Sequence, residues 1–251
     1  MAIGVGEFEY IRQVVHDGSA IVLEPGKEYL AEARLLPLAH REGFGTLQEL
    51  VSRMRGDPAS LLRRKVVEAM TTNETSFFRD LHPFEALRKH VLPDLSAVRA
   101  SERRLNIWCA ACSTGQEPYS IAMLLREHFS HLKTWSVRLI ASDLSAEILA
   151  RAREGRYNQL EVNRGLPAVL LVKYFQQRAS EWRIADDIRS MVEFVEINLA
   201  KAWPPLPSMD VILMRNVLIY FGLETKKRSC AKPGSYCARV GTSCWEARRR
   251  R

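Results

Sequence analysis

Residues 105–120, Leu-Asn-Ile-Trp-Cys-Ala-Ala-Cys-Ser-Thr-Gly-Gln-Glu-Pro-Tyr-Ser, combine small residues with a carboxylate in an order typical of a ligand site. Three apolar residues at the start of this stretch predict a short buried strand. The following residues are nearly all small, which lets a ligand approach the backbone, and Glu117-Pro118 opens a helix. A strand that leads through a tight loop to a helix N-terminus is the arrangement of nucleotide-type sites.

The chemistry of this loop argues against a phosphate ligand. The loop contains neither the GxGxxG pattern of dinucleotide sites nor the GxxxxGK[ST] pattern of P-loops. Glu117 lies where a pyrophosphate would otherwise bind, which favours a ligand with hydroxyl groups and a positive charge. S-adenosylmethionine, with its ribose, sulfonium and amino group, fits this description. An ordinary strand–loop–helix corner, in which small residues only permit close packing, explains the same residues about equally well.

A polar segment upstream, residues 70–80, holds a second group of candidate binding residues. Asn73 and Thr75 offer hydrogen bonds, and Arg79 offers a planar fork to a carboxylate. Two adjacent phenylalanines between them are suited to anchoring the segment in a core. A capped linker between two domains is the alternative interpretation.

Polar residues also follow later predicted strands, which we expect over residues 135–142, 192–197 and 210–214. The residues that follow these strands are Asp143, Asn198, Leu199, Arg215 and Asn216. The carboxyl ends of parallel strands share one edge of a sheet, and that edge is the ligand crevice of doubly wound folds. An acid after the second strand is where ribose hydroxyls are bound in such folds, although a lone aspartate there is more often an N-cap.

The N-terminal part of the chain is predicted to be helical, and the part from residue 105 is predicted to alternate between strands and helices. Apolar spacing and Gly/Pro breaks predict helices over residues 7–17, 28–42, 46–54, 59–70 and 83–90. Strand–helix alternation from residue 105 predicts a parallel sheet, interrupted by an inserted lobe over 155–190. Basic positions on the N-terminal helices, such as Arg34 and Arg41, form either a solvated face, the commoner case, or a surface for an acidic helical partner.

Composition narrows the class of protein. Of the 251 residues 47% are apolar, which supplies ample core. The chain has neither a run of about 18 apolar residues nor a basic-then-apolar N-terminus, so we expect a cytoplasmic protein without membrane insertion. The formal charge is +8, but residues 228–251 hold seven basic residues and one acidic residue, so this tail carries +6 and the body +2. A nearly neutral body gives no reason to expect nucleic-acid binding.

Cys109 and Cys112 form a C-x-x-C pair, which is half of a redox or zinc motif. No second C-x-x-C and no nearby histidine pair completes a zinc site. We therefore expect buried thiols and no metal.

Four motifs occur in order along the chain: Thr72-Asn-Glu-Thr-Ser-Phe-Phe-Arg79, Ala111-Cys-Ser-Thr-Gly-Gln-Glu-Pro-Tyr-Ser-Ile-Ala122, Ala141-Ser-Asp143 and Arg215-Asn-Val-Leu-Ile-Tyr-Phe221. Because of these four motifs, the chain resembles the chemotaxis receptor methyltransferases of the CheR type over about residues 7–227. The resemblance implies a class I S-adenosylmethionine-dependent methyltransferase domain, α/β and Rossmann-like, with a small inserted β-subdomain, after an all-helical domain. The domains expected are 1–70 (helical), 71–104 (linker and cofactor-lining segment), 105–227 (methyltransferase, with the insert at about 155–190) and 228–251 (an atypical basic tail).

The resemblance also implies a reaction, in which the methyl group of S-adenosylmethionine is transferred to glutamate carboxylates on the cytoplasmic helices of chemoreceptors. The residues that match cofactor-contacting positions of the family are Asn73, Thr75, Arg79, Glu117, Asp143, Asn198, Leu199, Arg215 and Asn216. Tyr220 matches the proposed active-site tyrosine, and we expect Arg79 or Tyr220 to orient the substrate carboxylate. The basic helix thought to meet the receptor is the segment around Arg34 and Arg41. The turn in the inserted lobe is short, so we expect no binding of a receptor tether peptide.

A glutamate side chain needs no general base for this reaction. Its ordinary pKa of about 4.3 makes it an anion at pH 7. Catalysis then consists of aligning the carboxylate oxygen with the methyl group and removing water from it.

The resemblance ends soon after Phe221. In the family, Glu-Thr-Lys is followed by a long amphipathic helix, a Pro-Gly turn and two closing strands. Here residues 228–251 show no helical or strand periodicity, and three cysteines with a terminal arginine run are typical of a shifted reading frame. Loss of those elements predicts that the strand over 210–214 is an uncovered sheet edge. The alternative function is therefore a catalytically impaired cofactor-binding or receptor-docking protein.

Overall fold

The structure, a computed structural model, describes residues 3–231 and 243–245. Its contacts divide the chain into two compact units. The first unit runs from the N-terminus to Thr72 and includes Leu199–Lys201 and Leu218–Ser229. The second unit comprises Asn73–Asn198, Ala202–Val217 and the described residues from Cys230 onward.

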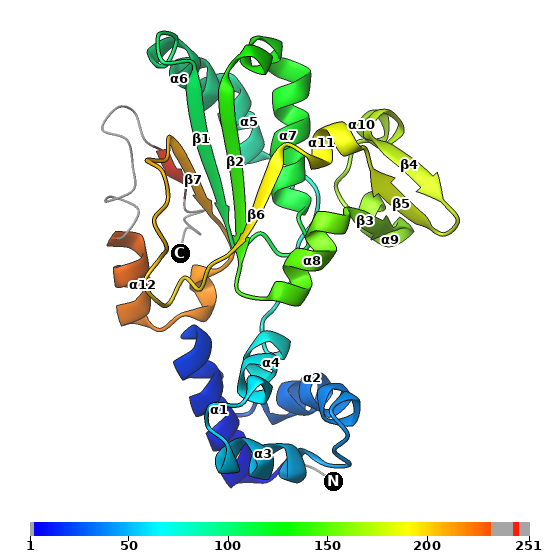
Figure 1. The fold of residues 1–251 in the computed structure, drawn as a ribbon, viewed down its shortest axis with the longest axis vertical. Helices are drawn as coiled ribbons and strands as arrows, with labels where there is room; N and C mark the ends of the chain where they lie inside the picture. The colour runs from blue at the N-terminus through cyan, green and yellow to red at the C-terminus, as the bar shows by residue number, and fades with distance from the viewer. Residues whose placement is uncertain (1–2, 232–242, 246–251) are drawn as a thin grey trace. The chain divides into compact units, whose positions relative to one another are not determined.

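Four helices form most of the first unit, as the sequence predicts: α1 (Val5–Ser19), α2 (Glu28–Arg41), α3 (Leu47–Gly56) and α4 (Leu61–Ala69) (Figure 1). Each helix buries its apolar stripe, and Ile11, Leu35, Leu50 and Val66 are fully buried. The first unit also contains the short 3-10 helix η3 (Leu218–Tyr220) and most of helix α12 (Leu223–Ala231).

The second unit is built on a parallel sheet with strand order β6-β2-β1-β7-β8 (Figure 1). Its strands are β1 (Arg104–Ala110), β2 (Ser136–Asp143), β6 (Val192–Glu196), β7 (Val211–Met214) and β8 (Ser243–Trp245). All four pairings are parallel. β1 is buried from Leu105 to its end, as expected for a central strand with near-continuous apolar sequence. The α/β fold class is confirmed.

Helices precede and connect these strands. They are α5 (His82–Ala86), the π-helical turn η1 (Leu87–Val91), α6 (Leu92–Val98), α7 (Gln116–His128), the 3-10 turn η2 (Ser130–Thr134) and α8 (Ala146–Glu154). The helix predicted over 83–90 is too short, because helical structure continues through the π-helical turn to Val98. Pro93 has no amide N–H to donate, and it lies at the start of α6, directly after the π-helical turn that interrupts the regular hydrogen-bond pattern.

The inserted lobe lies beside the sheet, next to α8 (Figure 1). It contains β3 (Arg156–Asn158), α9 (Gln159–Asn163), α10 (Ala168–Tyr174), β4 (Phe175–Arg178), β5 (Glu181–Ile184) and α11 (Asp186–Arg189). Its three strands form a separate antiparallel sheet in the order β3-β5-β4. The predicted inserted β-subdomain is therefore confirmed.

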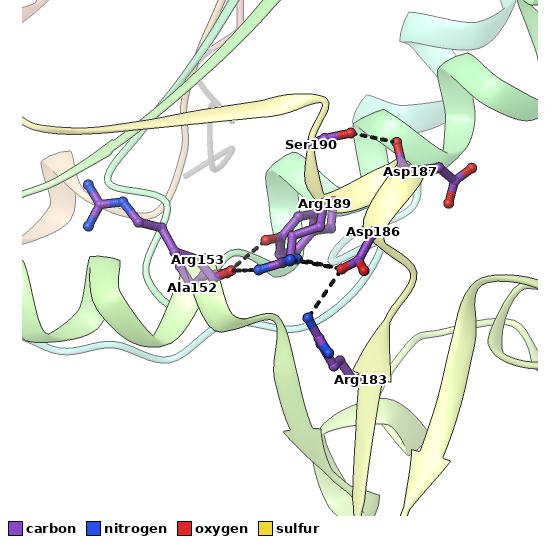
Figure 2. A network of polar contacts seen from close by, with 8 residues as sticks. Ala152, Arg153, Arg183, Asp186, Asp187, Arg189 and Ser190 are labelled. Atoms are coloured by element: carbon purple, nitrogen blue, oxygen red, sulfur yellow. Dashed lines mark hydrogen bonds and ion pairs between the residues drawn. The ribbon is translucent and has the colours of Figure 1, made fainter.

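A polar network joins this lobe to the end of α8 (Figure 2). Asp186 accepts hydrogen bonds from Arg183 and Arg189, and the Arg189 guanidinium also donates to the carbonyl oxygen of Arg153, at 3.2 Å. The base of the lobe is thereby held against the helix that precedes it.

The expectation that β7 is a sheet edge is wrong. β8 pairs in parallel with β7, in the register Val211↔Ser243 to Leu213↔Trp245. Apolar periodicity did not predict this strand because every residue except proline carries a backbone donor and acceptor, whatever its side chain. Helix α12 likewise continues to Ala231, into the segment in which no helical pattern was expected. The rest of the tail, 232–242 and 246–251, where the shifted-frame interpretation chiefly applies, lies outside the described residues.

Helices long and apolar enough to span a bilayer are not found in the described part of the chain.

Candidate functional site

The loop between β1 and α7 has an unusual backbone. Ala111 and Ser113 have φ values of +57° and +51°, and Gly115 has a φ of +94°. Left-handed conformations of non-glycine residues cost free energy and persist only where the surrounding contacts hold them. Two such contacts tie the loop to β2, because the Cys112 N–H donates to the Ser142 carbonyl at 2.8 Å and the Ser113 N–H donates to Asp143 Oδ2 at 2.9 Å.

Asp143, at the end of β2, is buried and organises this corner. Its second oxygen, Oδ1, accepts a hydrogen bond from the Ser145 N–H at 3.2 Å. The N-cap of α8 is Ser145, whose side chain accepts from the Ile148 N–H. The common N-cap interpretation of the aspartate is therefore wrong, and the Asp143 carboxylate is aimed at the loop after β1. The end of β6 also adjoins Asp143, because the Ile197 N–H donates to its backbone carbonyl, at 3.0 Å, one residue before Asn198.

The polar segment that begins at Asn73 packs against the same loop. The Ser113 hydroxyl donates to the Asn73 carbonyl at 2.9 Å, and the Phe78 N–H donates to Ser120 Oγ on α7 at 3.0 Å. Phe77 is fully buried, as its role as an anchor predicts. The Arg79 guanidinium donates to the Glu74 carbonyl at 2.7 Å, which closes the segment into a turn.

Arg215, which follows β7, joins three segments of the second unit. Its Nη1 lies 2.6 Å from Glu117 Oε2 in the first turn of α7, and its Nη2 lies 3.0 Å from Asp80 Oδ2 and donates to the Arg79 carbonyl at 2.7 Å. Its side chain is only 2% exposed. The planar guanidinium makes these bonds from two separate nitrogen atoms, a geometry that the single nitrogen of a lysine ammonium does not reproduce.

The electrostatics of the site follow from this burial. Burial raises the pKa of Glu117, and the adjacent Arg215 opposes the rise. Arg215 Nε is buried and has no hydrogen-bond partner among the described residues. A buried donor without an acceptor is costly unless a ligand supplies one.

These groups fit S-adenosylmethionine. Asp143 presents a buried carboxylate at this corner, and carboxylate oxygens are acceptors of the kind that ribose hydroxyls bind. Carboxylates at Asp143 and Glu117 suit a cationic ligand, and Arg215 Nε is a donor for an acceptor group. Residues 112–115 of the loop are buried, and a Cβ at Gly115 would lie 3.1 Å from the Tyr119 ring, so the loop packs closely on α7.

Cys109 and Cys112 are free, buried thiols, as expected. Burial raises the pKa of both well above the ordinary value, so they remain protonated and unreactive at neutral pH.

The predicted site residues do not all belong to the same unit. Asn73, Thr75, Arg79, Glu117, Asp143, Asn198, Arg215 and Asn216 belong to the second unit. Leu199 and Tyr220 belong to the first unit, where the Tyr220 carbonyl accepts from the Val22 N–H at 2.9 Å. Their roles at the cofactor site stay predictions.

Arg34 was expected on an exposed basic face of its helix, but in the structure its side chain is bonded to other parts of the protein. Its guanidinium donates to the carbonyl oxygens of Met70 and Thr71, at 2.7 and 2.9 Å, and to Thr72 Oγ1 at 3.0 Å. Arg34 is therefore half-buried and satisfies the carbonyl groups of Met70, the C-cap residue of α4, and of Thr71 after it. Helix termini leave such groups without intrahelical partners. Burial lowers its pKa.

Sequence reasoning missed several residues that shape the site. Asp80 pairs with Arg215, Ser120 holds Phe78, and the Tyr157 hydroxyl donates to the Thr114 carbonyl at 2.8 Å. Asp80 adjoins a recognised motif and Ser120 lies within one, but nothing local to Tyr157 predicts a partner 43 residues away.

Comparison with known proteins gives consistent results for both units. The family model "CheR methyltransferase, all-alpha domain" matches residues 6–71, and "CheR methyltransferase, SAM binding domain" matches residues 73–233. Chemotaxis protein methyltransferase Cher2 of Pseudomonas putida is 39% identical over 247 residues, which cover 94% of this chain and 89% of that protein. Chemotaxis protein methyltransferase 1 of Pseudomonas aeruginosa is 40% identical with the same coverage. The chemotaxis protein methyltransferase of Borreliella burgdorferi is 31% identical over 235 residues, which cover 92% of this chain and 83% of that protein.

Proposed function

The chain belongs to the CheR methyltransferase family, and from this premise we propose that it methylates glutamate side chains of chemoreceptors, forming glutamate methyl esters. S-adenosylmethionine is its cofactor, and the chain is an S-adenosylmethionine-dependent methyltransferase. The choice of glutamate, and of glutamates on the cytoplasmic helices of the receptors, is part of the proposal. It also sets the reaction in the cytoplasm, because that is where those helices lie.

The observation that carries this proposal is the meeting of three strand ends in the second unit. Ser113 follows β1, Asp143 ends β2 and Arg215 follows β7, and each is hydrogen-bonded to another part of the same corner. Ligands bind at this edge in open α/β sheets. Chemistry with a cofactor at this edge explains why strained backbone is retained there.

We assign the binding roles as follows. Asp143 accepts hydrogen bonds from ribose hydroxyls, and Glu117 balances positive charge while Arg215 holds it in place. Asn73, Thr75 and Arg79 line the site from the upstream segment, and the remaining contacts come from Asn198, Leu199 and Asn216. When bound, S-adenosylmethionine supplies an activated methyl group on its sulfonium.

The protein contributes orientation and exclusion of water rather than proton transfer. A substrate glutamate is already ionised at neutral pH, so no general base is required. Arg79 keeps N–H groups beyond the one it donates to Glu74, and either Arg79 or Tyr220 orients the incoming carboxylate. A loose pairing suits this role, because a tight ion pair lowers the nucleophilicity of the carboxylate. The short turn at Ala179 between β4 and β5 supports recognition without a tether peptide.

Radiolabelled S-adenosylmethionine tests this function directly. Incubated with a cytoplasmic chemoreceptor fragment, the protein should transfer label to base-labile methyl esters. A fragment with its accepting glutamates changed to alanine is the matched control. Label that resists mild base, or that appears equally on the control fragment, would refute glutamate methylation.

Calorimetric titration with S-adenosylhomocysteine separates binding from transfer. Binding together with ester formation supports the proposal. Binding without transfer would instead support the alternative of a catalytically impaired cofactor-binding protein, which the pairing of β8 with β7 disfavours.

A further inference from the structure

The inserted lobe contacts the loop between β1 and α7 through a buried hydroxyl. Tyr157, on β3, is 1% exposed, and its hydroxyl donates to the Thr114 carbonyl at 2.8 Å. Thr114 lies next to Ser113, whose N–H is bonded to Asp143. A residue of the lobe therefore satisfies a backbone acceptor in the middle of the cofactor-lining loop.

The same tyrosine also contacts the upstream segment. The Tyr157 ring meets the Phe77 ring edge to face with a centroid distance of 5.0 Å, and Phe175 on β4 meets Phe77 at 5.5 Å. Such pairs add stability beyond the area they bury. Phe77 is thus fixed by two aromatic rings that both belong to the lobe.

A third contact comes from the loop between α9 and α10. Arg164 lies 2.5 Å from the Glu74 carboxylate. Gly165, with a φ of +87°, lies so close to the Phe77 carbonyl that a Cβ at this position would overlap it. The backbone of the lobe therefore packs directly on residues 74–77.

We infer that the inserted lobe positions the two cofactor-lining segments, residues 73–80 and 111–115, with Tyr157 and Arg164 as positioning residues for cofactor binding. This inference rests on the proposed cofactor site and goes beyond it, because it gives the lobe a role inside the enzyme. Without the lobe, the strained loop and the turn at Phe78 would lose contacts that no residue of the main sheet replaces among those described here.

Other contacts of the lobe provide a control. Lys173 and Tyr174 bind Glu127 near the end of α7, and Arg189 binds the Arg153 carbonyl (Figure 2). These contacts attach the lobe without touching either cofactor-lining segment. Tyr174→Phe and Tyr157→Phe each remove one phenol hydroxyl from the lobe, but only the second removes a bond to the loop.

The test compares the affinity of the two full-length variants for S-adenosylhomocysteine, measured by calorimetry. Loss of one buried hydrogen bond predicts that Tyr157→Phe weakens binding about fivefold, while Tyr174→Phe stays within about twofold of the parent. In the methylation assay, KM for the cofactor should rise in Tyr157→Phe with kcat unchanged. An unchanged affinity in Tyr157→Phe, or equal losses in both variants, would overturn the inference.

Hydrogen exchange of the cofactor-free protein gives a readout that does not depend on the proposed function. The Ser113 amide should exchange faster in Tyr157→Phe than in Tyr174→Phe, and equal rates contradict a positioning role. If Tyr157→Phe does not fold, the exposed Arg164→Gln replaces it, with an expected affinity loss of about two- to threefold, and an unchanged affinity counts against the inference. Failure of the unmodified protein to bind S-adenosylhomocysteine would refute the proposed function. In that case the exchange rates of the Ser113 amide in the two variants would still show whether Tyr157 positions the loop.

Discussion

Arg215 is the residue on which the charge balance of the site depends. Its guanidinium neutralises Glu117 and binds Asp80 and the Arg79 carbonyl while almost fully buried. Removing one partner of a buried ion pair leaves the other charge without compensation, which costs more than the pair itself contributes.

Arg215→Gln is therefore expected to lower the free energy of unfolding by about 3–5 kcal/mol. Glu117→Gln should cost less, because Arg215 keeps two other acceptors. The double variant should be less destabilised than the sum of the single variants, because no unpaired carboxylate remains. Urea unfolding of the parent, the two single variants and the double variant gives the free energy of unfolding of each. Strictly additive losses would show that the two side chains are not coupled.

Gly165 and Gly43 make a matched pair for separating backbone strain from steric overlap. Their φ values are +87° and +85°, but a Cβ at Gly43 meets nothing within 4 Å, whereas one at Gly165 overlaps the Phe77 carbonyl. Gly43→Ala should cost about 1–2 kcal/mol from the left-handed backbone alone. Gly165→Ala should cost about 1–3 kcal/mol more in urea unfolding. Equal losses would mean that the lobe does not pack closely on residues 74–77.

Among the elements, α2 and α4 are linked through one side chain. Arg34 on α2 binds the carbonyls of Met70 and Thr71, which directly follow α4, so Arg34→Ala should lower the free energy of unfolding by about 1–3 kcal/mol. Arg53→Ala, at an exposed position on α3, is the control and should change it by less than about 0.5 kcal/mol. Similar small effects for both substitutions would show that Arg34 contributes no more to stability than an exposed arginine does.

The attachment of the lobe to α7 depends on pH through Glu127. Hydrogen bonds from Lys173 and Tyr174 lower the pKa of Glu127 below its ordinary value of 4.5. The unfolded chain then binds more protons in mild acid than the folded chain, so this contribution to stability is present above pH 4.5 and is lost as pH falls through the lower, folded pKa. The midpoint of thermal unfolding should fall more steeply with acidification in the parent than in Glu127→Gln. Parallel curves for the two proteins contradict this assignment.

At the scale of the whole molecule, charge is concentrated at one end of the sequence. Residues 246–251 contain four arginines and one glutamate, so deleting them reduces the formal charge by 3, from +8 to +5. We expect no specific nucleic-acid binding, and any non-specific binding of DNA at low salt should come from this tail. The deletion should therefore weaken such binding and reduce its salt dependence, while affinity for S-adenosylhomocysteine is unchanged. DNA binding that persists undiminished would place the basic surface in the body of the protein.

Local patterns carry much of the architecture. Apolar spacing predicts the four N-terminal helices, the strand that ends at Asp143 and the strand that precedes Arg215. Helix and strand periods are set by the backbone and recur in the side chains that face a core. Motif order identifies the fold and the cofactor, because small loop residues and strand-end polar groups are required by the ligand itself. The helix over 83–90 was predicted too short, because the π-helical turn breaks the side-chain period of the α5–α6 region. Strand β8 was not predicted, because a pairing made by the backbone alone requires no side-chain period.

The sequence by itself determined the class of protein, its cofactor and the residue types at the strand ends. Only the tertiary structure decided that Arg34 satisfies the carbonyls of Met70 and Thr71 after α4 instead of being exposed, that Ser145 rather than Asp143 caps α8, and that Tyr157 supports a loop 43 residues earlier in the chain. Arg34 and Tyr157 bind residues that are distant in the sequence, and Asp143 and Ser145 are two candidates for one N-cap. Their partners are therefore chosen by how the elements pack and not by the residues beside them.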